Sequence, residues 1–386
     1  MGNRTRFLAV LLALLCLTGC AIQTGWIIKD GKTLYADEQG YPVTGWQEIE
    51  GKTYFFSEDG SMVTGWLEVG GKTYFLLEDG TPNTGWLIDG EKQFFFSSDG
   101  TMAQGWTEVV GTQLYFGQEG MLAQGWTEID GKRYYFAADG TAVTGFLELE
   151  DDRYLLHEDG TAHTGWYTEG GKNYYFGTDG AMAVGQVEIE GETCYFNPHG
   201  VQMLLVNPWN YLPEGYTVEL ETVEGYEIAT ECADAMKQML DDCRAAGFNP
   251  AICSTYRTQE DQEFLYNRKV NNVMALGYNE EDARYLAAKE VAVPGTSEHQ
   301  LGLAVDIVDD DYWVLDEKQA EMPTQKWLME HCWDYGFILR YPVGSTDITG
   351  IVYEPWHYRY VGTEIAAELR ELNITLEEYL GAANHS

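Results

Sequence analysis

Hydrophobic and aromatic positions between Gly25 and Gly200 recur every twenty residues. Each unit opens with Gly-Trp or a variant of it, continues with alternating apolar and polar residues, and returns through an aromatic run such as Tyr54-Phe55-Phe56. Short alternating runs on either side of a Gly-containing turn predict a β-hairpin. Because twenty residues cannot bury their own aromatic side chains, the hairpins are expected to stack into an all-β solenoid of nine repeats.

After the repeats, the twenty-residue period ends, and the apolar positions follow helical spacing in some segments and strand alternation in others. Helices are predicted over residues 226–247, 280–291, 322–335 and 363–372, with two more beginning after the capping residues Thr258 and Thr375. Strands are predicted over residues 251–256, from 302 onward, and over 337–341 and 356–361. Helices and strands alternate here without β-α-β regularity, which favours an α+β domain with a small antiparallel sheet.

The predicted strand after Gly302 carries an acidic residue, Asp306, on its less crowded face. Successive side chains of a strand point to opposite faces, so Val305 and Ile307 would enter a core while Asp306 would face open space. His299 is an odd number of residues away from Asp306. A turn near Gly302 is therefore needed before the histidine and the aspartate can converge.

A second pair of polar residues, Glu354 and His357, follows far downstream. Pro355 disfavours helix at Glu354, so a loop leading into a strand is expected there. Together His299, Asp306 and His357 would give Zn²⁺ two imidazoles and one carboxylate and leave its fourth position to water, the arrangement of catalytic zinc sites. Zinc lowers the pKa of its water to about 7, and Glu354 would be placed to accept the proton of that water.

The two strings together resemble a known enzyme family. The string S-x-H-x-x-G-x-A-x-D (297–306), followed in order by E-x-W-H (354–357), is similar to that of the VanY-type D-alanyl-D-alanine carboxypeptidases, zinc peptidases that trim peptidoglycan stem peptides. The dipeptide Tyr256-Arg257 and the run G-F-I-L-R-Y-P (336–342) add to this resemblance, which covers about residues 205–362. It implies the α+β fold already expected from the pattern.

The resemblance also assigns roles within the motif. It implies that His299, Asp306 and His357 are the zinc ligands and that Glu354 is the general base. The arginine that matches Arg257 contacts the substrate or the developing oxyanion in that family.

Three further side chains are candidates for binding substrate. A carboxypeptidase must recognise a free C-terminus, and Arg257 can hold a carboxylate with two hydrogen bonds, although a structural ion pair is the alternative. Ser297 is expected either to hydrogen-bond the substrate or to orient its own loop. Gln262 lies one helical turn after Thr258 and is expected to reach the same pocket.

The N-terminal residues 1–19 are predicted to be a lipoprotein signal peptide. Arg4 and Arg6 precede eleven apolar residues (7–17), too few to span a bilayer as a helix. The sequence Leu17-Thr18-Gly19-Cys20 resembles a bacterial lipobox, in which case Cys20 would become the lipid-modified first residue; an ordinary signal peptide is the alternative. This predicts an extracellular, cell-wall-associated protein anchored to the outer face of a Gram-positive-type membrane.

The net charge restricts the kinds of molecule that the chain can bind, and the number of cysteines restricts how they can pair in disulfides. A formal net charge of −39, spread along the chain, argues against binding to nucleic acid and against simple electrostatic binding to anionic lipid or teichoic acid. Five cysteines remain after residue 20, an odd number that cannot all pair within the chain. Buried free thiols are expected for most of them.

The twenty-residue units resemble the cell-wall-binding repeats of choline-binding and glucan-binding proteins. Choline-binding units usually carry a second Trp before the Tyr pair, but that position holds Thr, Gln, Arg or Asn in all nine units here. A cage for a quaternary ammonium group needs several aromatic faces, so wall glycan is a better candidate ligand than a choline-bearing polymer. A purely structural role in the solenoid core is the alternative for the candidate wall-binding tryptophans, which recur directly after the first glycine of the unit: Trp46, Trp66, Trp86, Trp106, Trp126 and Trp166.

These observations predict three segments: a signal peptide (1–19), a wall-binding β-solenoid (20–203) and a zinc carboxypeptidase domain (204–386). The predicted reaction removes the terminal D-alanine from peptidoglycan stem peptides. Two alternatives remain open at this point: an L,D-carboxypeptidase acting on tetrapeptide stems, and a wall-binding adhesin whose peptidase domain is inactive.

Overall fold

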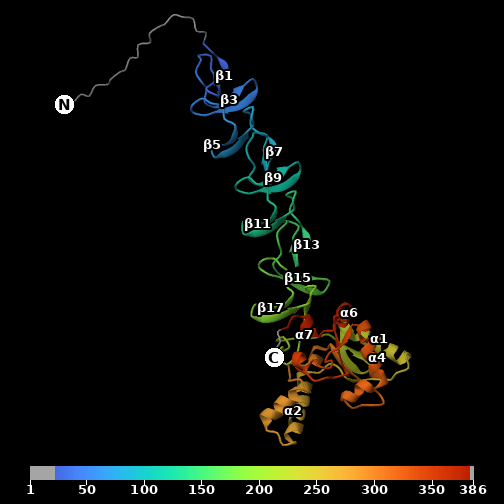
Figure 1. Ribbon diagram of the computed structural model, residues 1–386. Helices are drawn as coiled ribbons and strands as arrows, with labels where there is room; N and C mark the ends of the chain where they lie inside the picture. Colours follow the sequence, from blue (N-terminus) through green and yellow to red (C-terminus); the bar gives the residue numbers. More distant parts are fainter. Residues whose placement is uncertain (1–21, 383–386) are drawn as a thin grey trace, which may run out of the picture. The chain divides into compact units, whose positions relative to one another are not determined.

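The computed structural model describes residues 22–382 and forms two compact units (Figure 1). Of the described residues, the first unit contains those up to Leu147 together with Leu156–Ala162, and the second contains Glu148–Leu155 and those from His163 onward. The predicted signal peptide and the predicted lipidation site Cys20 lie outside the described residues. None of the helices within residues 22–382 is both long and apolar enough to cross a bilayer.

The repeats fold as the predicted hairpins, in which each odd-numbered strand is followed after two residues by the next strand. The eighteen strands are β1 (Gly25–Lys29), β2 (Lys32–Ala36), β3 (Gly45–Ile49), β4 (Lys52–Phe56), β5 (Gly65–Val69), β6 (Lys72–Leu76), β7 (Gly85–Asp89), β8 (Lys92–Phe96), β9 (Gly105–Val109), β10 (Thr112–Phe116), β11 (Gly125–Ile129), β12 (Lys132–Phe136), β13 (Gly145–Leu149), β14 (Asp152–Leu156), β15 (Gly165–Glu169), β16 (Lys172–Phe176), β17 (Gly185–Ile189) and β18 (Glu192–Phe196).

Hairpin β11–β12 shows why the repeat has this composition. Its turn residues Asp130 and Gly131 have φ angles of 51° and 75°, the left-handed conformation required by a two-residue turn that matches strand twist. The last aromatic of the returning strand, Phe136, is 1% exposed, so it belongs to the core between hairpins. Neighbouring hairpins are joined by backbone hydrogen bonds such as Leu122 N to Gln93 O, 2.8 Å. The predicted stacking of hairpins is therefore confirmed.

The second unit contains the predicted α+β domain, whose central sheet is antiparallel with the order β22-β23-β25-β24. Its remaining strands are β19 (Gln202–Met203), β20 (Leu220–Val223), β21 (Tyr226–Ala229), β22 (Pro250–Ser254), β23 (Ala304–Asp309), β24 (Phe337–Leu339) and β25 (His357–Tyr360). The α-helices are α1 (Thr230–Ala245), α2 (Gln259–Met274), α3 (Glu280–Ala288), α4 (Pro323–His331), α5 (Thr346–Thr349), α6 (Thr363–Leu372) and α7 (Leu376–Tyr379). Short 3₁₀ helices are η1 (Glu298–Leu301), η2 (Glu317–Glu321) and η3 (Cys332–Tyr335).

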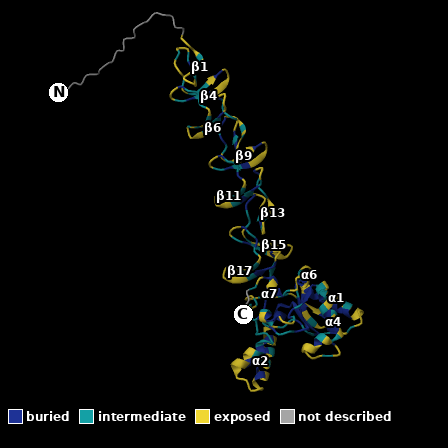
Figure 2. Ribbon diagram, viewed as in Figure 1, coloured by how far each residue is buried: buried dark blue, intermediate teal, exposed yellow. Residues whose placement is uncertain are grey.

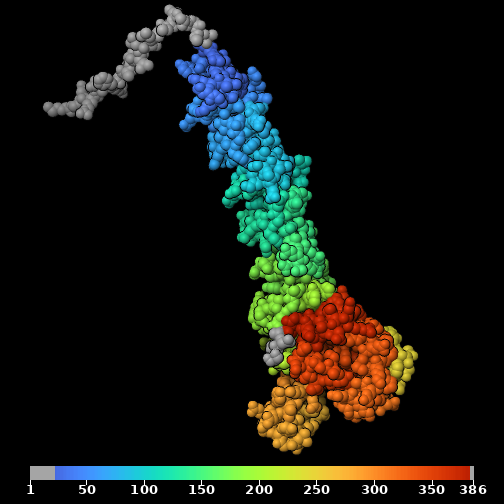
Figure 3. Space-filling model, in the orientation of Figure 1, coloured from blue at the N-terminus to red at the C-terminus, as the bar shows by residue number. Residues whose placement is uncertain are grey.

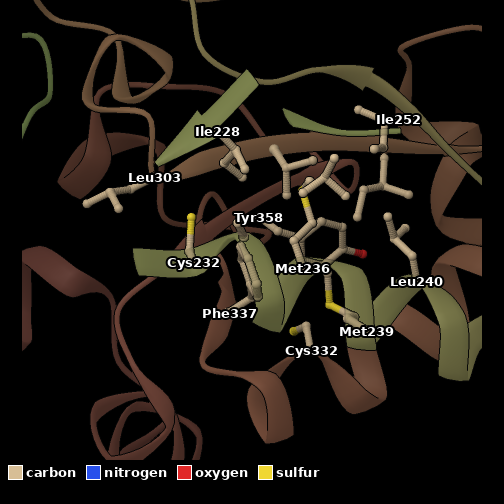
Figure 4. Packing of buried hydrophobic residues seen from close by; sticks show 14 of the residues in the cluster. Ile228, Cys232, Met236, Met239, Leu240, Ile252, Leu303, Cys332, Phe337 and Tyr358 are labelled. Atoms are coloured by element: carbon tan, nitrogen blue, oxygen red, sulfur yellow. The ribbon is translucent and has the colours of Figure 1, made fainter. Parts of the chain in front are cut away.

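Helix α1 provides the main core of this domain. Its buried residues Cys232, Met236 and Met239 pack with side chains from the central sheet, among them Phe337 and Tyr358 (Figure 4). These positions recur three or four residues apart and so lie on one face of the helix. Burying that face removes a large apolar area from water and fixes one side of the sheet, so that functional side chains gather on the other side.

The helix predicted over residues 226–247 begins later than expected. Residues Tyr226–Ala229 instead form β21, which pairs with β20 as a hairpin. Glu224 and Gly225 form its turn, with φ angles of 52° and 91°. Ile228 lies on the core side in either a strand or a helix, so the apolar pattern did not distinguish them. Similarly, α3 ends at Ala288, three residues before the predicted end.

Helices α2 and α3 form a small lobe with its own core. The lobe stands out in light orange in Figure 3, and Figure 2 shows that much of α2 is exposed. The capping box predicted at Thr258 is present, because the Thr258 side chain accepts from Asp261 N and the Asp261 carboxylate accepts from Thr258 N. The buried residues of the lobe are Tyr266, Val270, Val273, Ala283 and Ala287.

The C-terminal helices pack against the last repeat hairpin. Tyr195 of β18 belongs to one buried cluster with Leu369 of α6 and with Leu376 and Leu380 in and beside α7. The Tyr195 hydroxyl also donates to Asn210 Oδ1 at 2.6 Å. The last hairpin is thus part of the same compact unit as the α+β domain, as expected for a terminal repeat that docks onto another domain.

Candidate metal centre

Asp306 and His357 lie directly opposite each other in the central sheet. They are register partners between β23 and β25, and Asp306 also faces Ser254 of β22 across a break in the β22–β23 register. Val305, on the opposite face of β23, is fully buried in the main core. The predicted alternation of faces along this strand is confirmed, because the core fixes which side Asp306 occupies.

His299 reaches the same side from the short helix η1. Gly302 ends this helix with a φ of +77°, which supplies the predicted turn. A β-carbon at Gly302 would also lie only 3.3 Å from the backbone and side chain of Ala229, so any other residue is disfavoured there. His299 Nδ1 donates to the Thr255 carbonyl at 2.7 Å, which leaves Nε2 free to face Asp306.

The three side chains offer donor atoms at metal-binding separations. Their candidate ligand atoms all lie within 4.8 Å of one another. His299 Nε2 is 3.2 Å from Asp306 Oδ2, and His357 Nδ1 is 3.0 Å from Asp306 Oδ1. A tetrahedral zinc site with bonds near 2.0 Å requires ligand atoms about 3.3 Å apart. Two imidazoles and one carboxylate in this arrangement fit Zn²⁺ and leave one position open.

Burial and neighbouring charged groups shift the pKa values of all three candidate ligands. Burial and the Arg257 guanidinium lower the pKa of His299 to about 4, so its imidazole is neutral and its Nε2 can ligate. Burial opposes the charge of His357, but hydrogen bonds to Asp306 and Glu298 outweigh this and raise its pKa to about 9. Burial also opposes ionisation of Asp306, yet the two imidazoles hold the pKa of Asp306 well below its usual range.

The second nitrogen of His357 faces a buried carboxylate. Glu298 Oε2 lies 3.4 Å from His357 Nε2, and Glu298 is 1% exposed. Burial would raise the pKa of Glu298, but Arg340 and Arg359 hold it below its usual range. An ionised carboxylate on the outer nitrogen fixes which nitrogen of a histidine can ligate a metal, here Nδ1 of His357.

Glu354 stands beside the three candidate ligands. Its Oε2 lies 3.9 Å from His357 Nδ1, and its backbone N–H donates to Tyr341 O. Burial raises the pKa of Glu354 to about 8. The predicted loop before β25 is confirmed, and its Glu354 lines the same cavity as the candidate ligands.

Arg257 is held in place by three neighbours. Its Nε donates to Ser254 Oγ at 2.9 Å, its Nη1 to Gln262 Oε1 at 3.3 Å, and its Nη2 to Asp306 Oδ2 at 3.1 Å. Gln262 is fully buried and also donates to Ala292 O, so the structure places it behind Arg257. A direct contact of Gln262 with substrate stays a prediction.

One cavity of about 590 Å³ joins these groups. Its lining includes the three candidate ligands, Glu354, Arg257 and Ser297, with Tyr341 and Trp356 as aromatic walls and Arg268 and Lys269 of α2 further away. Ser297 is 3% exposed and precedes η1. It can therefore fulfil either role predicted for it, contact with a bound molecule or support of the loop.

Sequence analysis did not identify Glu298, Arg340 or Arg359, which surround the outer side of His357. Arg340 directly follows the apolar strand β24, and Arg359 lies between two tyrosines of β25, where a charged side chain must be paired if it is buried. That signal could have identified the two arginines. Their common partner depends on tertiary structure and has no pattern in the sequence.

A buried site with two imidazoles, one carboxylate and an adjacent glutamate is characteristic of a metal-dependent hydrolase. The model of the D-alanyl-D-alanine carboxypeptidase family VanY matches residues 225–363. The chain belongs to this family. Models of choline-binding repeats match residues 43–81 and 163–209, and a model of cell-wall-binding repeats matches residues 124–142.

Individual relatives agree with this assignment. A D-alanyl-D-alanine carboxypeptidase of Enterococcus faecalis is 43% identical over 179 residues, which cover 46% of this chain and 65% of the relative. The bifunctional D-Ala-D-Ala dipeptidase and carboxypeptidase VanXYC of Enterococcus gallinarum is 40% identical over 145 residues, which cover 35% of this chain and 70% of the relative. The matches thus span about two thirds of the length of each relative.

Among solved structures, a VanY D,D-pentapeptidase from a VanB-type resistance cassette, in complex with Zn(II), is 43% identical; the match covers 46% of this chain and 97% of that one, with a TM-score of 0.42. The LD-carboxypeptidase LdcB is 36% identical, with 45% and 83% of the chains covered and a TM-score of 0.39.

The tryptophans predicted to bind wall polymer lie at the surface of the repeats. Each packs edge-on against an aromatic residue of the returning strand, as Trp66 does against Phe75, with ring centroids 5.2 Å apart. Trp46 and Trp126 are partly buried, whereas four are 42–45% exposed: Trp66, Trp86, Trp106 and Trp166. Less than half of each of these four residues is thus open to a ligand, because each packs both on its own hairpin and on the next one, as Trp66 does on Phe94 with ring centroids 4.9 Å apart.

Proposed function

We propose that this chain is a zinc carboxypeptidase that removes the C-terminal D-alanine from peptidoglycan stem peptides. The observation that carries the proposal is the convergence of His299, Asp306 and His357 with Glu354 and Arg257 on one cavity. The names of its relatives support the substrate class. On this proposal residues 204–386 are the catalytic domain and residues 20–203 are the wall-binding solenoid.

A zinc ion bound by the three ligands would polarise the scissile carbonyl and supply a water molecule of lowered pKa. Glu354 accepts one proton from the attacking water and passes it to the amine of the departing D-alanine. The products are the shortened peptide and free D-alanine, so one water is consumed for each bond that breaks. Burial of Glu354 excludes bulk water from this proton transfer.

Arg257 binds the free carboxylate of the substrate. A guanidinium has five N–H donors, and three of those of Arg257 are used by Ser254, Gln262 and Asp306. One donor remains on each terminal nitrogen, which suffices for a two-point contact with a carboxylate. This requirement favours a carboxypeptidase over an endopeptidase.

The decisive test is to incubate the purified chain with synthetic penta- and tetrapeptide stems, with and without a chelator. Free D-alanine from the pentapeptide, abolished by the chelator and restored by Zn²⁺, is expected. Release from the tetrapeptide alone would replace the proposal with an L,D-carboxypeptidase. Release from neither would favour the adhesin.

We further propose that the exposed tryptophans bind wall glycan and that Cys20 carries a lipid anchor on the outer face of the membrane. Retention of the chain on purified cell walls, unaffected by added choline, supports glycan binding; elution by choline would favour a choline-bearing polymer instead. Metabolic labelling with a fatty acid, compared between the native chain and Cys20→Ala, tests the anchor.

A further inference from the structure

A network of buried charges extends from the metal centre away from the cavity. Glu298, whose Oε2 faces His357 Nε2, accepts hydrogen bonds at Oε1 from two arginines. Arg340 Nε lies 2.8 Å and Arg359 Nη1 2.9 Å from this Oε1 atom. Arg340 then donates both terminal nitrogens to Glu377, with Nη1–Oε2 and Nη2–Oε1 distances of 2.8 and 2.6 Å.

The four charged side chains of this network compensate one another. Glu298, Arg340 and Arg359 are each 1% exposed, and Glu377 is 3% exposed. The two positive and two negative charges sum to zero. Their mutual attraction offsets the desolvation free energy that burying each charge requires. Removing the charge of Glu377 would leave an excess positive charge two side chains away from His357.

Glu377 is itself held from two directions. Helix α7 begins with a capping box formed by Thr375 and Glu378, which fixes the orientation of the helix. Asn207, in the connector after the last hairpin, donates its side-chain N–H to Glu377 Oε1 at 3.1 Å. Both Glu377 and Asn207 lie outside residues 225–363, the segment that matches the carboxypeptidase family model.

We propose that Glu377 is a positioning residue of the metal centre, acting on His357 through Arg340 and Glu298. This inference rests on the proposed function, because it requires His357 to bind a metal. The carboxylate behind a ligating histidine sets the orientation of the ring and its basicity. The bidentate contact of Arg340 with Glu377 fixes the guanidinium and, through it, the place of Glu298.

A purely structural role for Glu377 predicts a different result from a positioning role. A structural ion pair would change only the stability of the fold. A positioning residue also changes the affinity of the site for metal and the ligand field of the bound ion. Metal affinity and the absorption spectrum of the Co²⁺-substituted protein therefore separate the two roles.

The experiment compares the full chain with Glu377→Gln, a variant of equal size without the charge. Zn²⁺ affinity is measured by competition with a chromogenic chelator, and the visible spectrum is recorded after Co²⁺ substitution. The expected result is an affinity about tenfold lower and a shifted Co²⁺ spectrum, since outer partners of metal ligands typically contribute 10- to 100-fold. The matched control is Glu371→Gln on α6, an exposed glutamate whose side chain has no recorded hydrogen bond or ion pair within residues 22–382, and it should behave as wild type.

Two milder variants keep the test decisive if Glu377→Gln does not fold. Glu377→Asp keeps the charge on a shorter side chain, and Asn207→Ala removes a single hydrogen bond to Glu377. Both should lower the metal affinity in the same direction but less. Unchanged affinity and spectrum in a folded variant with reduced thermal stability would overturn the inference and leave the proposed function intact. A wild-type chain that binds no metal would overturn both.

Discussion

Arg257 and Asp306 form an ion pair, with Nη2 and Oδ2 3.1 Å apart, inside the cavity that contains the candidate metal ligands. Sequence analysis left two interpretations of Arg257 open, substrate contact or structural ion pair. The structure contains this ion pair, which occupies only one N–H donor of the Arg257 guanidinium. One residue can therefore both compensate the charge of a metal ligand and bind a carboxylate.

Replacing Arg257 with alanine should reduce kcat/KM roughly 10- to 150-fold, because a hydrogen bond to a charged group contributes about 1.5–3 kcal/mol. The loss should be confined to peptides with a free C-terminus. The measurement compares a pentapeptide with its C-terminal amide, and the variant should lose the preference for the free acid. Arg284→Ala, which affects an exposed ion pair on α3, is the control. An unchanged preference would leave Arg257 with a structural role alone.

Replacing Glu354 with glutamine should leave metal binding intact and reduce the rate by roughly 10²–10⁴-fold, the usual contribution of a general base. The amide keeps the size of the side chain but cannot accept a proton from water. Metal content is measured by atomic absorption and the rate by release of D-alanine. Loss of the metal in this variant would instead make Glu354 a ligand. Glu330→Gln, on the exposed face of α4, should have no effect on either quantity.

Zinc should stabilise the folded chain. A ligand that binds only the folded state adds about 2.7 kcal/mol at a concentration one hundred times its Kd, which corresponds to a rise in Tm of roughly 5–10 °C for a domain of this size. Differential scanning calorimetry with and without Zn²⁺ measures the rise. His299→Ala should abolish the response to zinc, and a response that persists in this variant would contradict the assigned ligand set.

In the solenoid, core packing should contribute far more to stability than the exposed ion pairs. Phe96→Ala removes a side chain that is 1% exposed and should cost roughly 3–5 kcal/mol. Lys72→Ala breaks an exposed pair with Asp99, 3.5 Å long, and should cost about 1 kcal/mol or less. Hydrogen exchange of the β7 and β8 amides, read by mass spectrometry, compares the two. Equal loss of protection would contradict this account of the repeat.

The sequence predicted the local backbone structure around the site well, because each turn, strand and loop there depends on residues that are neighbours in the chain. The turn at Gly302, the strand that carries Asp306, and the loop before His357 all follow from alternation and from proline and glycine chemistry. The motif also indicated which side chains would meet, although the register that pairs Asp306 with His357 could be seen only in the folded sheet.

The sequence could not reveal the partners that lie far apart in the chain. Glu298 and Glu377 are separated by 79 positions, and only folding brings both to Arg340. The hairpin β20–β21 was missed for a different reason. A Glu-Gly turn before an apolar stripe is compatible with either a strand or the first turn of a helix, and the pairing with the preceding residues Leu220–Val223 decides between them.

The thiols described among residues 22–382 are all free, which has a consequence for how this part of the chain is held together. Burial raises the pKa of Cys232 and Cys243 to about 12. A buried thiol with so high a pKa stays protonated and is almost never the thiolate that thiol–disulfide exchange requires. The cysteines at positions 194, 232, 243, 253 and 332 therefore contribute to the described structure as free thiols and not as cross-links.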